Sequence, residues 1–326
     1  MPKGYYHLTY ELRCQIYILK DSGSSAAAIS RALNVSPSTI SRELSRNMGT
    51  KGYCYLEAQE KAIKRKNSKP SSKLTTTIIS TIDEKLNEQW SPVQISGWMQ
   101  IHEMECVSYK TIYNYIAKDA KLGGSLRKQL RHNGKKYNKQ SKGNSGRGCI
   151  PNRIDIDQRP AIVDQKTRLG DWELDTIIGA AHKGVIVSMV ERVSKLTKIV
   201  KVSRKTADEV AQAIIDQLMP YKAFVYTLTS DNGKEFAFHQ KISLELSAEF
   251  YFATPYHSWE RGLNEHTNGL IRQYFPKSQS FTNLTSEDIL RVENLLNSRP
   301  RKVLGFATPQ ETFDKLSSQM LSLEVR

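Results

Sequence analysis

The sequence has few cysteines, and they follow no metal-binding or disulfide pattern. Four occur among 326 residues: Cys14, Cys54, Cys106 and Cys149. Neither a C-x-x-C pair nor a histidine pair at zinc-finger spacing accompanies them, so no zinc site and no disulfide framework is predicted. The chain also lacks an apolar N-terminal signal region and any uncharged apolar run of about 18 residues. A reduced, cytoplasmic protein without a membrane partner is therefore expected.

Acidic residues are scarce in the first half of the chain. Residues 1–153 contain 26 Lys and Arg against 11 Asp and Glu, whereas residues 154–326 contain 22 of each class. The entire net charge of +15 therefore lies in the first half. A basic half joined to a neutral half favours a module that binds a polyanion, since neutralised phosphates release counterions. The alternative is an ordinary soluble surface that happens to be basic.

The basic half begins with three predicted helices at helix-turn-helix spacing. Thr9 can cap the first helix, which ends at Gly23, and the second runs from Ser25 to Leu33. Ser36 caps the third helix, with Pro37 at its first position. Five polar residues of this third helix point outward, toward phosphates and base edges. They are Ser38, Thr39, Ser41, Arg42 and Arg46. DNA binding is favoured over a plain helical bundle with a polar surface.

A weaker copy of the same pattern follows. Ser91 and Pro92 begin one helix, and Ser108 begins another that presents Thr111 and Asn114. This pair is either a second DNA-reading unit or a helix pair with a packing role only. The stretch "RHNGKKYNKQSKGNSGRG" has a linker composition. The predicted domains are 1–68 (helix-turn-helix), 69–130 (second helical unit), 131–152 (basic flexible linker) and 153–326 (catalytic domain with C-terminal helices).

The neutral half changes its hydrophobic period. "DWELDTIIG", "GVIVSMVER" and "LTKIVKVSRK" are strand-like runs with short connections, as in an antiparallel meander. An amphipathic helix, the strand "FVYTLTSDNG", a helix, the strand "EFYFATP" and a last helix follow. The order βββαβαβα predicts an α/β fold of the ribonuclease H-like type, preceded by the all-α helix-turn-helix region.

That order gives Asp231 a position beside the first strand. In such a sheet the strand that ends at Asp231 lies parallel to "DWELD", at the edge where sites collect. Asp171, Glu173 and Asp175 alternate along that strand and share one face, so the residues alone leave the neighbouring carboxylate open. Two adjacent carboxylates repel unless they share a cation, and Glu265 is placed to add a third. Hard oxygen ligands favour Mg²⁺ or Mn²⁺.

Three motifs, "WELDT", "TSDNGKEF" and "SWERGLNEHTNGLIRQYFP", resemble the DDE catalytic core of integrases and transposases. The chain is most similar to the bacterial insertion-sequence family whose founder is insertion sequence thirty. The resemblance extends to "GCIPNRIDIDQRP", to "NSRPRKVLGFATPQETF" and to the helix-turn-helix, so it covers nearly the whole chain. It implies that the catalytic and metal-binding acids are Asp175, Asp231 and Glu265, the last two separated by 33 residues. His266 departs from the family pattern, which more often has asparagine there.

Other polar residues near these motifs have simpler interpretations. Asp171 and Glu173 are expected at a solvated strand start, and Glu235 in the first turn of its helix. Asn268 and Arg272 share the helix face of Glu265 and are candidates for contact with the scissile DNA strand, with solvation as the alternative. The basic residues of "NSRPRKVLGF" are interpreted as contacts either to DNA or to a second subunit, and the choice stays open.

The resemblance implies a transposase that binds the terminal inverted repeats of its element, cleaves phosphodiester bonds and joins the 3′-OH to target DNA. Two Mg²⁺ or Mn²⁺ ions about 3.5–4 Å apart would be held by the three acids, with Asp175 bridging. A homo-oligomer assembled on double-stranded DNA in the bacterial nucleoid is expected. No nucleotide cofactor is expected, because no G-x-x-x-x-G-K-[ST] motif occurs.

Two other functions are compatible with the same residues. A transposase-derived regulator would bind the repeats through residues 9–47 without cleaving them, although intact acids argue against it. A free nuclease of this fold would cut but not join, and it would not need two DNA-reading units. Mg²⁺-dependent nicking separates the enzyme from the regulator, and a joined product separates it from the nuclease.

Overall fold

The computed structural model describes residues 7–50, 52–67, 74–131, 150–255 and 257–324. The chain divides into two compact units between Lys73 and Leu74. Most of the predicted linker, residues 132–149, lies outside the described residues, as does Cys149. The other three cysteines are free thiols. Within the described ranges no helix has the length and apolarity that crossing a bilayer requires.

The first unit contains the predicted helix-turn-helix. Thr9 and Ser25 cap the first two helices, because each side chain accepts a hydrogen bond from a backbone N–H three residues ahead. The Ser36 hydroxyl instead contacts the Ser38 hydroxyl at 2.8 Å, so Ser36 occupies the cap position without bonding the backbone. The elements are α1 (Tyr10–Asp21), α2 (Ala26–Ala32), α3 (Pro37–Asn47), β1 (Met48–Gly49), β2 (Gly52–Tyr53) and α4 (Tyr55–Asn67).

The core of this unit is small and includes a buried ion pair. Ile16, Ile29 and Ile40 are fully buried in it. The Arg13 guanidinium donates to the Glu43 carboxylate at 2.8 Å, which ties α1 to α3. The Tyr53 hydroxyl also donates to Glu43. The helix α4 was not predicted from the sequence. Its last turn is basic, which suits the negative end of the helix dipole.

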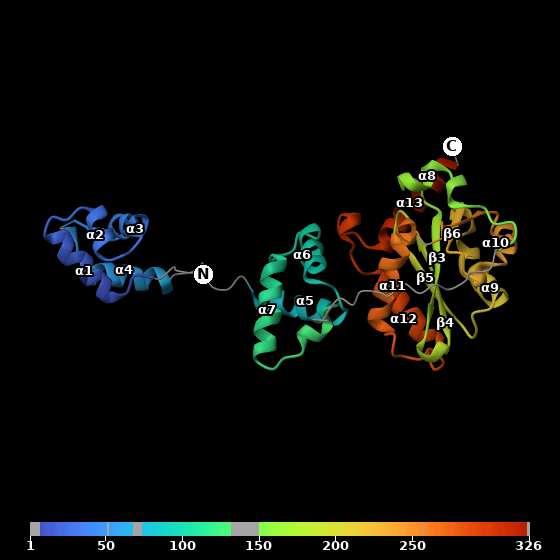
Figure 1. Cartoon of the computed structure of the whole chain (residues 1–326), viewed down its shortest axis with the longest axis horizontal. Helices are drawn as coiled ribbons and strands as arrows, with labels where there is room; N and C mark the ends of the chain where they lie inside the picture. Colours follow the sequence, from blue (N-terminus) through green and yellow to red (C-terminus); the bar gives the residue numbers. More distant parts are fainter. Residues whose placement is uncertain (1–6, 51, 68–73, 132–149, 256, 325–326) are drawn as a thin grey trace. The chain divides into compact units, whose positions relative to one another are not determined.

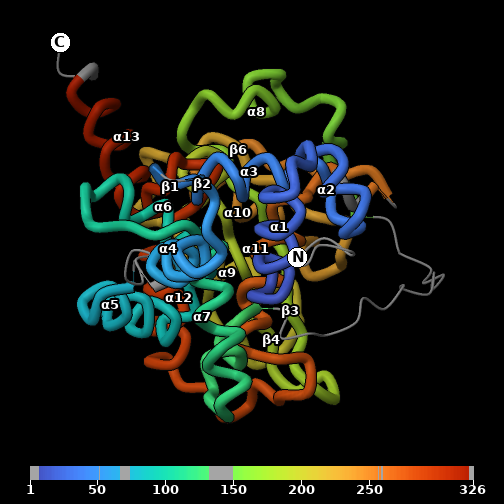
Figure 2. Tube along the Cα trace, turned by 90° about the vertical axis from the view of Figure 1, so that its left-hand side faces the viewer, coloured from blue at the N-terminus to red at the C-terminus, as the bar shows by residue number. Residues whose placement is uncertain are grey.

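The second unit begins with a three-helix segment, whose trace runs from cyan to green in Figure 2. Its helices are α5 (Thr76–Asn87), α6 (Pro92–Ile101) and α7 (Tyr109–Lys121). Ser91 and Gln94 form a reciprocal capping box at the start of α6, and Ser108 caps α7. Gln94 Nε2 also donates to the Pro300 carbonyl at 2.8 Å. A Cβ added at Gly97 would lie 2.3 Å from the ring of Phe306. This close approach requires a glycine.

The remainder of the second unit is a five-stranded mixed sheet between helical layers. The strands are β3 (Asp171–Ile178), β4 (Val185–Glu191), β5 (Thr197–Val202), β6 (Thr227–Ser230) and β7 (Glu249–Phe252). The helices are α8 (Ala161–Gln165), α9 (Ala207–Leu218), α10 (His239–Leu246), α11 (Gly262–Tyr274), α12 (Ser286–Asn297) and α13 (Pro309–Glu324). Short 3₁₀ turns span Leu126–Gln129, Ile156–Gln158, Ala180–His182, Met219–Phe224, Lys234–Phe236, Ser258–Arg261 and Lys302–Leu304.

The sheet order is β5-β4-β3-β6-β7, with β3, β4 and β5 antiparallel and β3, β6 and β7 parallel. Figure 1 shows α11 and α12 on one face of the sheet and α9 and α10 on the other. This topology confirms the predicted βββαβαβα order and the ribonuclease H-like fold. β3 is the central strand, so residues at its start are covered on both sides.

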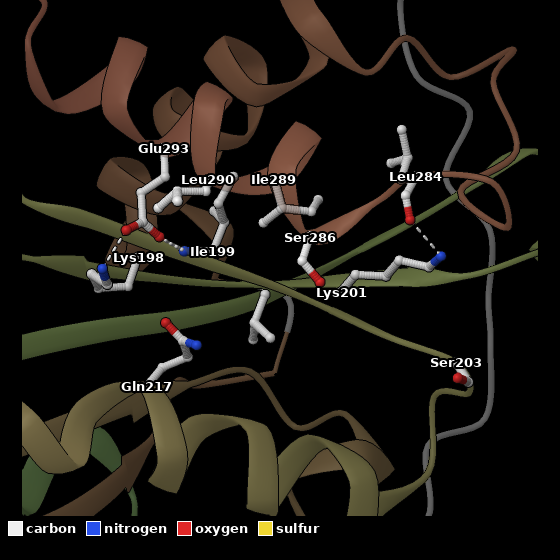
Figure 3. Close-up of a pocket in the computed structure, with 11 residues that line it drawn as sticks. Lys198, Ile199, Lys201, Ser203, Gln217, Leu284, Ser286, Ile289, Leu290 and Glu293 are labelled. Carbon is white, nitrogen blue, oxygen red and sulfur yellow. Dashed lines mark hydrogen bonds and ion pairs between the residues drawn. The ribbon is translucent and has the colours of Figure 1, made fainter.

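Both edges of the sheet are partly covered by other parts of the chain. At β5, Asn297 of α12 bonds both the N–H and the carbonyl of Thr197, and Glu293 accepts from the Ile199 N–H at 2.8 Å. Figure 3 shows Glu293 between that N–H and the Lys198 ammonium. At β7, the Phe252 N–H donates to the Ile154 carbonyl at 2.9 Å.

Candidate active site

Asp175 and Asp231 lie side by side on neighbouring parallel strands. The parallel β3–β6 register ends at the pair of Glu173 with Thr229, and Asp175 and Asp231 each follow two residues later. Arg261, in the turn before α11, lies between the two carboxylates. Its guanidinium nitrogens are 3.7 Å from Asp175 Oδ2 and 3.5 Å from Asp231 Oδ2. The fold thus gathers two acids around one cation.

Each carboxylate is also oriented by hydrogen bonds. Asp231 Oδ1 accepts a hydrogen bond from the Gly233 N–H at 2.9 Å. This local bond fixes the orientation of the carboxylate just after β6. Asp175 Oδ1 accepts from the Thr176 N–H, and its Oδ2 accepts from Asn268 Nδ2 at 2.8 Å. Burial raises the pKa of Asp175, the Arg261 cation opposes this rise, and the Asp231 charge adds to it. Asp175 is therefore an acid whose charge depends on a neighbouring cation.

Glu265 is in the first turn of α11 and is exposed. Among the described residues, no three Asp, Glu, His or Cys side chains are grouped closely enough to hold a metal ion. Glu265 is therefore not gathered with the two aspartates in this arrangement. It lies one helical turn before Asn268, the residue that contacts Asp175, so the helix that carries it is attached to the site.

The start of α11 is anchored to β3 by polar contacts. The Asn264 N–H donates to Glu173 Oε2 at 3.2 Å, and Asn264 Nδ2 donates to the Leu174 carbonyl at 3.0 Å. Arg261 donates to the same carbonyl at 3.2 Å. Arg192 pairs with Glu173 at 3.3 Å. Glu173 on β3 thus caps the start of α11, because it accepts a hydrogen bond from a backbone N–H in the first turn of that helix. Sequence periodicity does not indicate such a contact between distant elements.

The expectation that Asp171 and Glu173 are solvated was wrong. Their exposed fractions are 1% and 2%. Asp171 accepts from Arg168 at 2.7 Å and from the Thr227 hydroxyl at 2.8 Å. Cationic side chains from the flanking loops make this burial possible, because a buried carboxylate requires compensating partners. Hydrophobic alternation along a strand does not indicate such partners.

Glu235 was expected in the first turn of its helix, and it lies instead in the short 3₁₀ turn Lys234–Phe236 before α10, where it is buried. Its carboxylate accepts from the Thr176 hydroxyl at 3.0 Å and pairs with Lys205 at 2.7 Å. Thr176 follows Asp175 on β3, and successive side chains point to opposite faces. Glu235 therefore supports the strand from the face opposite Asp175.

Two of the predicted DNA-contacting side chains are engaged inside the protein. Asn268 bridges β3 and β4, because its amide also accepts from the Ser188 hydroxyl at 3.0 Å. Arg272 donates to the Ile178 carbonyl at 2.7 Å and stacks over Phe281. Both are half-buried. The DNA-contact hypothesis for them remains a prediction, now competing with these internal bonds.

The helix-turn-helix candidates lie on the surface of the first unit. Ser38, Ser41, Arg42 and Arg46 are exposed on α3, and Thr39 is half-buried. Arg42 and Arg46 line a cavity of about 390 Å³ together with Arg65 of α4. Arg65 also donates to Asn47 Oδ1 at 2.6 Å, so α4 contributes a cation that motif spacing did not indicate. Arg42, Arg46 and Arg65 thus give the cavity beside α3 a basic lining.

In the second helical segment, the predicted contacts differ in their surroundings. The Thr111 hydroxyl is 3.0 Å from that of Ser108, within the cap of α7. Asn114 is exposed one turn later. The cavity drawn in Figure 3 lies between β5 and α12, and neither Asp175 nor Asp231 lines it.

Similarity to known proteins identifies the chain. Residues 5–47 match the family model described as a helix-turn-helix domain. The chain is 45% identical over 316 residues to the transposase for insertion sequence element IS4351 of Bacteroides fragilis, covering 96% of this chain and 97% of that protein. It is 34% identical over 323 residues to the transposase InsI for insertion sequence element IS30A of Escherichia coli K12, covering 95% and 84%.

A solved structure with a similar core is the catalytic core domain of BIV integrase, at 22% identity and a TM-score of 0.38, covering 46% of this chain and 97% of that one. The ribonuclease H-like fold itself is established by the strand order and register. With two such relatives matched over nearly its full length, the chain belongs to the IS30 family of insertion-sequence transposases, DDE-type enzymes that act on DNA.

Proposed function

We propose that Asp175, Asp231 and Glu265 are the catalytic acids of this transposase. The observation that supports this most is that the carboxylates of Asp175 and Asp231 both contact the Arg261 guanidinium, at 3.7 Å and 3.5 Å. Two carboxylates so placed suit a shared divalent cation, and Arg261 is a protein cation that stands in for one. Glu265 is the nearest acid on the helix that Asn268 joins to Asp175.

The donor set consists of hard oxygen atoms, which fit Mg²⁺ or Mn²⁺. Asp175 and Asp231 would hold such ions, two in number by the family resemblance, with Glu265 as the third ligand. Bound there, they would supply the activation of a water or 3′-hydroxyl nucleophile and the stabilisation of the leaving 3′ oxygen. Asn268 would keep the Asp175 carboxylate in position, and Arg261 would neutralise the acid pair until ions bind.

The remaining assignments concern DNA handling. The α3 residues Arg42 and Arg46, with Arg65 beside them, would hold the terminal inverted repeat. The 74–131 segment would form a second contact region, with Asn114 as its exposed polar residue. We also propose domain boundaries at residues 68, 130 and 152. The protein would assemble as an oligomer on two element ends and would need no nucleotide cofactor.

A supercoiled plasmid that carries the element's ends tests this assignment. Wild-type protein with Mg²⁺ should cleave at the ends and form joined product without ATP, whereas EDTA or Asp231→Asn should abolish both reactions. End binding without cleavage under any divalent ion would favour the regulator. Cleavage without joining would favour the nuclease.

A further inference from the structure

A group of cations surrounds two adjoining cavities beside α11. The first cavity, of about 290 Å³, is lined by Lys166, Lys195 and Arg301 along with His266. The second, of about 310 Å³, shares Arg301 and His266 with the first. It adds Arg131, Arg299 and Lys302. No Asp or Glu is among the described residues that line either cavity.

The two central arginines are buried with part of their hydrogen-bonding capacity unused. Arg299 is 2% exposed and Arg301 is 8% exposed. Arg299 donates to Gln273 and to the Tyr274 hydroxyl, and Arg301 donates to the Leu296 carbonyl at 2.9 Å. The Nε atoms of both arginines lack a hydrogen-bond partner. Buried charges are normally paired, so each of these guanidinium groups has a donor left that an anion could accept.

The local electrostatics agree with that interpretation. Burial and the neighbouring Arg299 lower the pKa of Arg301 to about 10. Within the described residues, no ion pair joins any of the cavity's cations to a carboxylate. An anion in the cavity would relieve this mutual repulsion.

The cavities lie on the flank of α11 opposite the one that contacts Asp175. Asn268 faces Asp175, whereas His266 and Leu270 face the cavities. Glu265 precedes His266 by one residue, about 100° around the helix, and so lies on the exposed ridge between the two flanks. A helix is about 10 Å across and a DNA strand carries a phosphate every 3.4 Å or so. A strand at the acids would reach the cavities within a few nucleotides.

We infer that the cavities lined by Arg301, Lys166 and Lys195 bind a backbone phosphate of the DNA strand that passes over α11 to the acidic pair. This inference rests on the proposed function, because DNA lies over α11 only if it is processed at Asp175 and Asp231. Guanidinium and ammonium groups suit the oxygens of a phosphodiester. The sequence left open whether the basic residues of "NSRPRKVLGF" contact DNA or a second subunit. This inference assigns them to DNA.

The test measures binding of the full chain to a labelled duplex that carries the element end and its flanking DNA, in EDTA so that no cleavage occurs. Arg301→Gln and Lys166→Gln are compared with wild type across a series of KCl concentrations. Each should weaken binding and reduce the slope of log K against log[KCl] by about 0.9, the value for one phosphate contact. Lys222→Gln, at the opposite end of β6 from Asp231, is the matched control and should leave the slope unchanged.

Ethylation of single phosphates locates the contact. A modified phosphate near the cleavage position should weaken binding of wild type but not of Lys166→Gln. Lys166 is exposed, so this variant remains informative if Arg301→Gln unfolds. Salt slopes equal to that of the control in both variants would overturn the inference. A variant with an unchanged slope but an altered sedimentation mass would also overturn it, because the residue would then contact a second subunit instead of DNA. Asp231→Asn should retain the wild-type slope, so failure of the metal site is distinguished from failure of the phosphate site.

Discussion

Arg261 lies between Asp175 and Asp231, where we propose that a divalent ion binds, so Arg261→Gln should tighten Mn²⁺ binding. Unit charges about 4 Å apart attract by about 4 kcal/mol at an effective dielectric constant of about 20. The side chains here are 13–29% exposed, and solvation and rotamer entropy reduce the net value to about 0.5–1 kcal/mol per contact. Loss of both contacts therefore amounts to about 1–2 kcal/mol, or about 5- to 30-fold in the dissociation constant.

The assay is a titration of free Mn²⁺ by electron paramagnetic resonance, without DNA, so activity does not enter the measurement. Arg204→Gln removes an equal charge from an exposed pair with Glu209 and should leave Mn²⁺ affinity unchanged. Asp231→Asn should abolish the site. Equal or weaker Mn²⁺ binding by Arg261→Gln, with the site still dependent on Asp231, would refute the idea that Arg261 and the metal compete.

Three further variants test other parts of the structure. Glu265→Gln should lower cleavage and joining by at least about 10²-fold while end binding is retained, since a metal ligand supports several kcal/mol of charge stabilisation; full activity in the plasmid assay would remove Glu265 from the site. Arg13→Ala leaves buried Glu43 without its cation and should destabilise the first unit by about 3–5 kcal/mol, seen as an earlier calorimetric transition. Gly97→Val should cost about 1–3 kcal/mol because its Cβ meets the Phe306 ring, and an unchanged melting temperature would contradict that contact.

The parts of the fold that follow local patterns were predictable from the sequence. Alternating strands, short turns and an amphipathic helix gave the order βββαβαβα, and hence the neighbourhood of Asp175 and Asp231. Serine and threonine caps marked the starts of α1, α2, α6 and α7, because they satisfy orphan N–H groups locally. The helix α4 was missed, since its basic last turn resembles the composition of a linker.

The surroundings of the acids depend on distant partners and were not predictable. Glu173 is buried because Arg192 and the Asn264 N–H reach it from other elements. Glu235 pairs with Lys205, which lies in the loop before α9. The position of Arg261 between the two aspartates follows from the path of one 3₁₀ turn, for which no periodicity exists. The strand order predicts which acids lie near one another, the family resemblance selects Asp175 among three candidates on its strand, and tertiary contacts decide how each acid is buried and hydrogen-bonded.

The contacts that cover part of each sheet edge constrain how copies of this enzyme could associate. Unpaired strand edges are the usual template for joining β-sheets of separate chains. Here the α12 amide and carboxylate cover the Thr197 and Ile199 backbone, and the segment around Ile154 covers Phe252. These contacts hinder the pairing of another chain's strand at Thr197, Ile199 and Phe252. If two copies assemble on a pair of element ends, as proposed, contacts through helices, loops and shared DNA are favoured over strand pairing at these positions.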